Sequence, residues 1–163
     1  MHFAELMKSD LHGRLGIFNL VSPDDPSVDV KIHSKLMLVD GRCLTVGSAN
    51  INQRSFNFDV ELNLVLDARE SDSPNCVQEL ENRMLAQRTG LSVREWREEV
   101  EGNANSKCTA MRERAHTWSG LQEGLDFLTP GTVSHEVMDI SIWIMHLQQN
   151  PSSIRCRKRN HLR

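Results

Sequence analysis

Residues 32–50 read IHSKLMLVDGRCLTVGSAN, a stretch in which two apolar runs flank one glycine-containing turn. A period of two along residues 28–39 predicts a strand that carries His33 and Lys35 on the same face. Asp40-Gly41 then predicts a two-residue hairpin turn, because both central residues of a type I′ turn need positive φ. The stretch therefore predicts a β-hairpin on which an imidazole and an ammonium lie side by side, next to a polar loop.

Two more strands are predicted around this hairpin. Residues 14–21 form a short apolar run that ends at turn-rich sequence, which is typical of a buried strand. Residues 60–67 alternate, with Glu61 and Asn63 on one face and an apolar, core-facing set on the other: Val60, Leu62, Leu64 and Leu66. Residues 47–57 have the composition of a loop. We therefore expect a sheet of at least four strands.

Helical signals follow the strands. Ser73 and Pro74 predict a helix N-cap and first helical residue, and Gly90 predicts the end of that helix. The capping box SVRE at residues 92–95 begins a second helix that ends near Gly102. We expect the apolar stripes of both helices to pack on the sheet.

The signals weaken after the second helix. We predict one folded domain over residues 1–102 and a helical or irregular extension over residues 103–163. Within the extension a helix is expected around residues 107–118 and a turn at residues 128–131. Residues 155–163 are strongly basic and are typical of a solvated end.

The composition is that of a soluble globular protein, with 163 residues of which 39% are hydrophobic and 25% charged. That length suits one domain or part of a larger protein. The basic tail leaves 14 of the 19 Lys and Arg residues against 22 acidic ones, so the body carries a net charge near −8. Such a surface does not attract polyanions in general, so nucleic acid is not the expected partner.

Cysteine spacing and hydropathy give expectations about disulfides, metal binding and membrane segments. The four cysteines are widely separated and lack a metal-ligand spacing, so they are expected to be free thiols. The first twenty residues lack the apolar core of a signal peptide, and the apolar run 137–147 is too short for a membrane span. Localisation stays open: the cytoplasm is the default, and export is an alternative if the N-terminus is missing.

The polar residues of the opening stretch form a spaced pattern, His33-x-Lys35-x4-Asp40-x6-Gly47-Ser48-x-Asn50. This pattern resembles the HKD motif of the phospholipase D superfamily at every defining position. Three later segments are similar to the sequence after the second HKD motif in bacterial phospholipase D-like proteins and cardiolipin synthases: NQRSF (52–56), VELNLVL (60–66) and ENRMLAQRTGL (81–91). The resemblance thus covers residues 14–91.

The resemblance implies an α/β/α sandwich and a phosphodiesterase that works without a metal or other cofactor. A phosphodiester is anionic and resists attack, so its cleavage needs a nucleophile, positive charge near the non-bridging oxygens and an acid for the leaving group. An imidazole can serve as nucleophile or acid near neutral pH. The residues assigned to catalysis are His33, Lys35, Asp40 and Glu61. The residues expected to bind the phosphate are Lys35, Ser48 and Asn50.

Two of these assignments carry alternatives. Asp40 lies at the predicted hairpin turn, so we expect a structural role for it, and a role in the chemistry is the alternative. Glu61 matches a family glutamate that hydrogen-bonds an active-site histidine, and a solvated strand glutamate is the competing interpretation. The resemblance implies that Glu61 orients an imidazole.

The chain departs from the family pattern because it carries one HKD motif, whereas superfamily enzymes bring two together. Of the seven histidines, His33 alone has Lys at the second position after it. The second motif would come from another copy in a homodimer or from a missing N-terminal half, and the downstream resemblance favours the missing half. In that arrangement His33 corresponds to the general acid, while in a homodimer either copy of it could be nucleophile or acid.

Three functions follow as hypotheses. The leading one is hydrolysis or transfer of a phospholipid headgroup through a phosphohistidine, with transient contact between the protein and a membrane surface. The second is a nuclease of the same superfamily, because the phosphate-handling residues do not distinguish a lipid from a nucleotide diester. The third is a catalytically incomplete fragment or phosphate-binding module, because one motif supplies half of a site.

Overall fold

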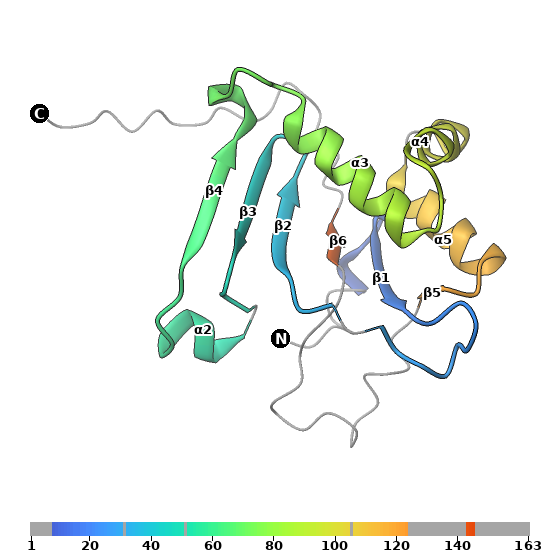
Figure 1. Ribbon diagram of the computed structural model, residues 1–163, viewed down its shortest axis with the longest axis horizontal. Helices are drawn as coiled ribbons and strands as arrows, with labels where there is room; N and C mark the ends of the chain where they lie inside the picture. The colour runs from blue at the N-terminus through green and yellow to red at the C-terminus, as the bar shows by residue number, and fades with distance from the viewer. Residues whose placement is uncertain (1–7, 31, 51, 105, 124–142, 146–163) are drawn as a thin grey trace, which may run out of the picture.

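The computed structural model describes residues 8–30, 32–50, 52–104, 106–123 and 143–145, which combine helices and small sheets (Figure 1). Its strands are β1 (Leu15–Leu20), β2 (Lys35–Val39), β3 (Cys43–Gly47), β4 (Asn63–Asp67), β5 (Leu121–Glu123) and β6 (Trp143–Met145). Its helices are α2 (Gln53–Asn57), the 3-10 helix η1 (Ala68–Glu70), α3 (Cys76–Arg88), α4 (Val93–Gly102) and α5 (Lys107–Thr117). The predicted α/β class is confirmed.

The described residues form two three-stranded sheets, whereas the sequence predicted one sheet of at least four strands. In the first sheet β3 pairs antiparallel with β2 on one side and β4 on the other. In the second sheet β1 lies between β5 and β6. The predicted strand at residues 14–21 is confirmed as β1, but its partners come from the far end of the chain.

The strand that was predicted to start at residue 28 is shorter than expected. Residues 28–30 lie against the end of β1, where the Ser22 amide donates to the Val28 carbonyl over 2.8 Å and the Val30 amide donates to the Leu20 carbonyl over 2.8 Å. Their backbone groups are used there, so β2 begins only at Lys35. His33 therefore precedes the strand and does not lie within it.

The predicted hairpin turn between β2 and β3 is confirmed. Asp40 and Gly41 have φ values of 53° and 63°, as a type I′ turn requires. The Arg42 amide donates to the Val39 carbonyl over 2.9 Å and closes the turn. Five residues of β2 then pair with five of β3, from Lys35 opposite Gly47 to Val39 opposite Cys43.

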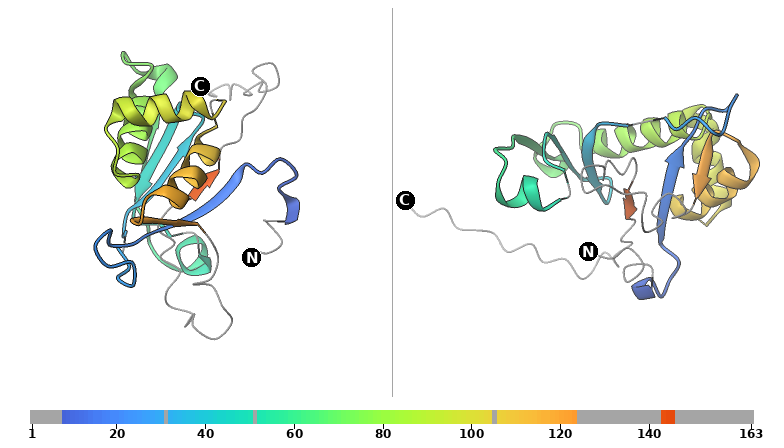
Figure 2. Two further views of the ribbon diagram at one scale, coloured as in Figure 1. Left: turned by 90° about the vertical axis from the view of Figure 1, so that its right-hand side faces the viewer. Right: turned by 90° about the horizontal axis from the view of Figure 1, so that it is seen from below.

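Helices α3 and α4 begin and end close to the predicted residues. The capping box of α4 is confirmed, with the Ser92 and Glu95 side chains each bonded to the other's backbone amide. Helix α3 ends before Gly90, which has a φ of 67°. It begins at Cys76 and not at Pro74, because the Ser73 carbonyl accepts from the Cys76 amide in a turn before the helix. Both views in Figure 2 show α3 on one side of β2 and β3.

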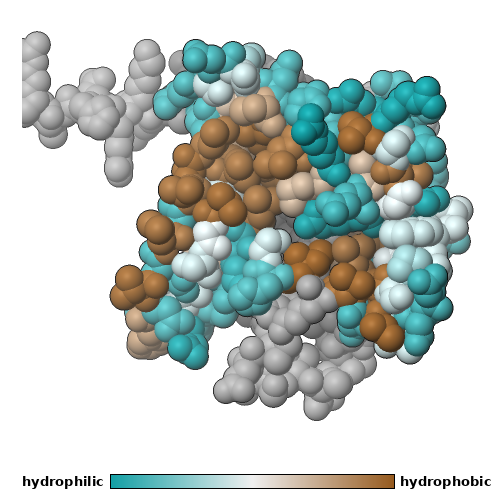
Figure 3. Space-filling model, viewed as in Figure 1, coloured by the Kyte–Doolittle hydropathy of each residue, from teal (hydrophilic) through white to brown (hydrophobic). Residues whose placement is uncertain are grey.

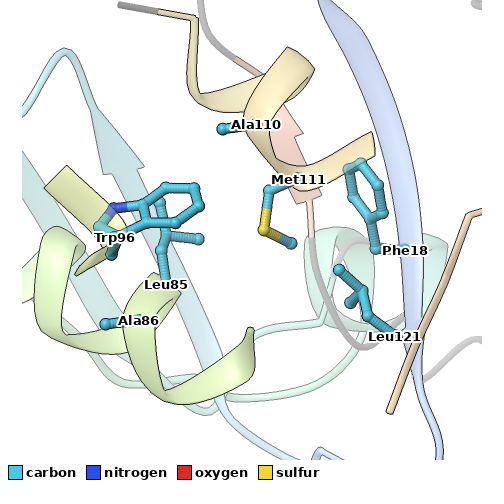
Figure 4. Close-up of a cluster of buried hydrophobic side chains, with 7 residues drawn as sticks. All are labelled: Phe18, Leu85, Ala86, Trp96, Ala110, Met111 and Leu121. Carbon is cyan, nitrogen blue, oxygen red and sulfur yellow. The ribbon is translucent and has the colours of Figure 1, made fainter. Parts of the chain in front are cut away.

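The hydrophobic core lies where α3, α4 and α5 meet β1 and β5 (Figure 4). Trp96 of α4 and Met111 of α5 are fully buried. The buried residues of this cluster are Phe18, Leu85, Ala86, Trp96, Ala110, Met111 and Leu121. The core thus joins residues on both sides of position 102, where the sequence predicted a domain boundary.

Two charged side chains of α5 reinforce this packing. Lys107 forms a 2.6 Å ion pair with Glu81 of α3, and both side chains are largely shielded from solvent. Arg112 donates to the Gly13 and Leu15 carbonyls over 2.6 Å each and to Glu123 over 2.7 Å. The guanidinium therefore connects Gly13 and the first residue of β1 to Glu123 of β5, in keeping with its five donors.

Strand β4 differs most from the prediction. The apolar face expected to be in the core is exposed, with fractions of 102% for Val60, 75% for Leu62, 67% for Leu64 and 40% for Leu66. The strand begins at Asn63, three residues later than predicted. Figure 3 shows apolar residues gathered over β2–β4. The described residues of this chain therefore leave much of the apolar surface of this sheet uncovered.

Cys43, Cys76 and Cys108 are free thiols, as predicted, and Cys156 lies outside the described residues. The predicted turn at residues 128–131 and the basic tail at 155–163 also lie outside them. In the described part of the chain, no helix combines the length and apolar character that a membrane span needs.

Substitution of Met111 tests whether α5 belongs to the same folding unit as β1 and α4. We expect Met111→Ala to lower the free energy of unfolding by about 2–5 kcal/mol, because it leaves a cavity in a fully buried cluster. Urea unfolding followed by circular dichroism should show one transition at a lower midpoint. Arg94→Ala, at an exposed position of α4, is the control and should change the free energy by less than about 0.5 kcal/mol. Two separate transitions would contradict a shared core.

Candidate functional site

The imidazole of His33 and the ammonium of Lys35 meet at the start of β2. Lys35 Nζ lies 2.8 Å from His33 Nε2 and donates to the His33 carbonyl over 2.9 Å. An ammonium has three donors and no acceptor, so this contact requires a neutral imidazole with its proton on Nδ1. The predicted pairing of the two side chains is thus present, although His33 lies before the strand. His33 is exposed and can be reached by a ligand.

The sheet register brings a second group of polar residues to the same end. Lys35 pairs with Gly47, which in turn pairs with Asn63 at the start of β4. Directly beyond this row, Ser48 Oγ donates to Glu61 Oε2 over 2.5 Å and accepts from the Leu62 amide over 3.0 Å. Residues far apart in the sequence therefore form one polar cluster at the end of the sheet.

Gly47 allows the close approach of the strands in this cluster. A Cβ atom at this position would lie 2.0 Å from Asn63 Oδ1 and 2.2 Å from the Leu62 carbonyl oxygen. Neither distance is compatible with a side chain. The glycine of the motif is thus needed for packing, and it lets the Ser48 amide donate to the Leu62 carbonyl over 3.0 Å.

The Glu61 carboxylate accepts a hydrogen bond from the Ser48 hydroxyl group. The Ser48 hydroxyl and then the Ser55 hydroxyl lower the pKa of Glu61, desolvation opposes them, and the nearby positive charge of Lys35 adds the smallest lowering. Because the folded-state pKa is the lower one, the stabilisation is present above the unfolded-state pKa and is lost as the pH falls through the folded-state pKa. Glu61 is therefore an anionic hydrogen-bond acceptor at neutral pH.

The segment that was predicted to be a loop contains the short helix α2, and this helix positions a residue that the sequence analysis missed. Asn52 is its N-cap and accepts from the Ser55 amide over 2.8 Å. Ser55 Oγ accepts from the Asn50 amide over 3.1 Å, and the Ser55 hydroxyl also lowers the pKa of Glu61. The spacing of Asn52 and Ser55 is that of an N-cap and the residue whose amide it binds, which is the signal that could have indicated the helix.

Asp40 lies at the other end of β2 from the cluster. It follows the last residue of the strand, whereas His33 precedes the first. A five-residue strand is on the order of 17 Å long, so the carboxylate of Asp40 is remote from the imidazole within one chain. The structure thus brings His33, Lys35, Ser48 and Glu61 to one end of the sheet, with Asn50 in the adjoining loop, and places Asp40 at the other end of β2.

The chemistry available here is that of an anion-binding site with an imidazole. Lys35 supplies a cation, His33 supplies a neutral nitrogen nucleophile or, when protonated, an acid, and Glu61 fixes the Ser48 hydroxyl group beside them. In the described part of the chain, no group of three or more His, Cys, Asp or Glu residues is arranged to hold a metal ion.

Comparison with known proteins gives two matches over this region. Residues 12–87, which contain the whole cluster, match the family described as cardiolipin synthase, PLD-like domain. A phospholipase D from Phytophthora infestans is 33% identical over 95 residues, which are 57% of this chain and 5% of that protein. The chain thus spans about one twentieth of the length of this curated relative. No solved structure matches the chain.

Substitutions of Asp40 test whether the turn needs a residue here that tolerates a positive φ. We expect Asp40→Asn to leave the thermal midpoint nearly unchanged, because asparagine tolerates the positive φ of this residue. Asp40→Val should destabilise by roughly 1–2 kcal/mol, because a β-branched residue is strained there. Differential scanning calorimetry measures both, and equal midpoints for the two variants would contradict a conformational role.

Proposed function

Because this chain belongs to the phospholipase D superfamily, we propose that it forms half of the active site of a phosphodiesterase that acts on phospholipids. The observation that carries the proposal is the 2.8 Å contact between His33 Nε2 and Lys35 Nζ, beside the Ser48 and Glu61 pair. This arrangement supports a site in which a nucleophilic nitrogen and a cation act on one phosphate. The similarity to a phospholipase D supports the lipid as the substrate class.

Binding of the phosphodiester activates the imidazole in this proposal. A non-bridging oxygen takes over the hydrogen bond from Lys35, which frees His33 Nε2 for the phosphorus atom. Asn50 supplies a further neutral donor from its side chain, while the proton of Ser48 is directed to Glu61. Ser48 thus supports the site through Glu61, and direct donation to phosphate needs a rearrangement of its hydroxyl group.

The covalent route needs two imidazoles. One nitrogen attacks phosphorus to form a phosphohistidine as the bond to the leaving alkoxide breaks, and a second imidazolium protonates that alkoxide. Water or an alcohol then displaces the histidine, with the second imidazole as its base. His33 takes one of these roles, and a second His–Lys motif, from another copy or from a further half of the enzyme, takes the other.

The exposed apolar residues of β4 support the proposal that further polypeptide completes the enzyme. Leu64, Val65 and Leu66 are consecutive, point to alternate faces of the sheet and are all exposed. An exposed apolar face such as that of Leu64 and Leu66 is typical of a sheet surface covered by further structure, as in the α/β/α sandwich implied by the family. We infer that additional polypeptide covers this sheet in the complete enzyme.

Turnover of a chromogenic phosphodiester in EDTA, with native mass measured on the same sample, tests the proposal. We expect metal-independent hydrolysis by the assembled protein. We also expect His33→Ala to lower kcat by about 10²–10⁴-fold, because it removes a group that takes part in proton or phosphoryl transfer. His116→Ala is the matched control, since His116 is exposed on α5, and it should retain the parent rate.

Two substrates then distinguish the lipid from the nucleic acid. Headgroup release from phosphatidylcholine or phosphatidylglycerol vesicles, without cleavage of single-stranded DNA, is the expected pattern. Cleavage of DNA alone would overturn the phospholipid assignment and identify a nuclease. Equal rates for the parent protein and His33→Ala would overturn the assignment of this site.

A further inference from the structure

We propose that Asn63 is a further substrate-binding residue of this site, whose side-chain amide donates to the phosphate that Lys35 binds. This role deepens the proposed phosphodiesterase function and rests on it. It is carried by the position of the Asn63 side chain over Gly47, in the row of paired residues that begins with Lys35.

Strand register places the Asn63 side chain on the same face of the sheet as Lys35. Lys35 is directly opposite Gly47, and Gly47 is directly opposite Asn63, where β2, β3 and β4 lie side by side (Figure 1). Directly opposite residues of antiparallel strands project to the same face, and neighbouring strands are about 4.8 Å apart. The side chains of Lys35 and Asn63 therefore flank Gly47, which has no side chain of its own.

The Asn63 side chain uses the space that this glycine leaves. Its Oδ1 atom lies 2.0 Å from the position that a Cβ atom of residue 47 would take, so the carboxamide extends from β4 over β3. The next residue in the row is Lys35, and the Cα atoms of such antiparallel pairs are roughly 5 Å apart. Gly47 thus allows an amide group of β4 to lie closer to Lys35 than any side chain at residue 47 would permit.

One hydrogen bond determines which way the amide group of Asn63 faces. The Ala49 amide donates to Asn63 Oδ1 over 3.4 Å, so the oxygen is directed to the loop after β3 and Nδ2 is directed away from it. Nδ2 carries two N–H donors, and no acceptor among the described residues is bonded to them. Asn63 is exposed, so a ligand can reach these donors.

A neutral donor meets a chemical need on this side of the site. Glu61 lies two residues before Asn63 and is an anionic acceptor, and the proton of Ser48 is directed to it. A phosphate bound by Lys35 therefore needs donors here to offset the nearby carboxylate. The Asn63 amide supplies them without a change of charge, and a hydrogen bond to an anion is stronger than one between neutral groups.

Titration with inorganic phosphate, followed by NMR of the side-chain amides, tests the binding role without any need for activity. In protein labelled with ¹⁵N, the Asn63 Nδ2 signals are assigned by their loss in Asn63→Asp. We expect phosphate to shift them over the same concentration range as the ring signals of His33. The Nδ2 signals of Asn103 are the control and should not move, because this group is bonded to Glu99 and Glu113.

Two variants separate binding from a purely structural role of the side chain. Asn63→Asp keeps an oxygen for the Ala49 amide but has no N–H donor, whereas Asn63→Ala removes both without adding charge. We expect Asn63→Ala to raise the dissociation constant of phosphate by roughly 10- to 100-fold, as loss of a hydrogen bond to an anion does. Asn63→Asp should raise it further, because its carboxylate repels the ligand.

The Leu62 amide reports whether the fold survives both substitutions. It donates to Ser48 Oγ, and its chemical shift should stay close to that of the parent protein. A response to phosphate at His33 but not at Asn63, or an unchanged dissociation constant in Asn63→Ala, would overturn the inference and leave the proposed function standing. Absence of a response at both residues would overturn the phosphate site itself.

Kinetics of the assembled enzyme extend the test to the substrate. We expect Asn63→Ala to raise KM for a chromogenic phosphodiester more than it lowers kcat, because a donor that binds the ground state and the transition state alike acts on KM. An unchanged KM would contradict the binding role. Absence of turnover in the parent protein would instead contradict the proposed function, and the phosphate titration would still decide the role of Asn63.

Discussion

The close approach of β3 and β4 at Gly47 is the constraint on which the whole site depends. The Gly47–Asn63 pair sets the register, and the Ser48 amide and hydroxyl then bond both backbone groups of Leu62. A slip of one residue would move every side chain of β4 to the other face of the sheet and take Glu61 away from Ser48. The polar cluster is therefore a consequence of strand register as much as of the residues that form it.

Much of this cluster is predictable because its signals are local. Asp40-Gly41 specifies a type I′ turn by its own conformational preference, and this turn fixes which residues of β2 and β3 face each other. His33 and Lys35 are two residues apart, so their side chains come into contact even though His33 lies before the first residue of β2. The motif and its hairpin thus need little information from the rest of the chain.

The sequence prediction failed where contacts between residues distant in the sequence determine the local structure. Alternation continued back to residue 28, but hydrogen bonds from β1 take up residues 28–30. Helix α2 has five residues, too few to show a helical period, and it is specified by the cap Asn52. The weak signals after residue 102 likewise gave no indication that Met111 and Leu121 pack in the same cluster as Phe18. None of these contacts leaves a repeated pattern in the sequence.

The charge of the site, like its single imidazole, indicates that the proposed reaction needs a second His–Lys motif. Lys35 and Glu61 carry opposite charges, and His33 is neutral when it accepts from Lys35, so these three groups together have no net charge. A phosphodiester brings one negative charge, and further charge builds up on its oxygens as it is attacked. In the proposed reaction, a second His–Lys motif would add a second cation next to those oxygens and an imidazolium for the leaving group. One additional motif would thus meet both the electrostatic and the proton requirement of that reaction, which neither Lys35 nor His33 can meet alone.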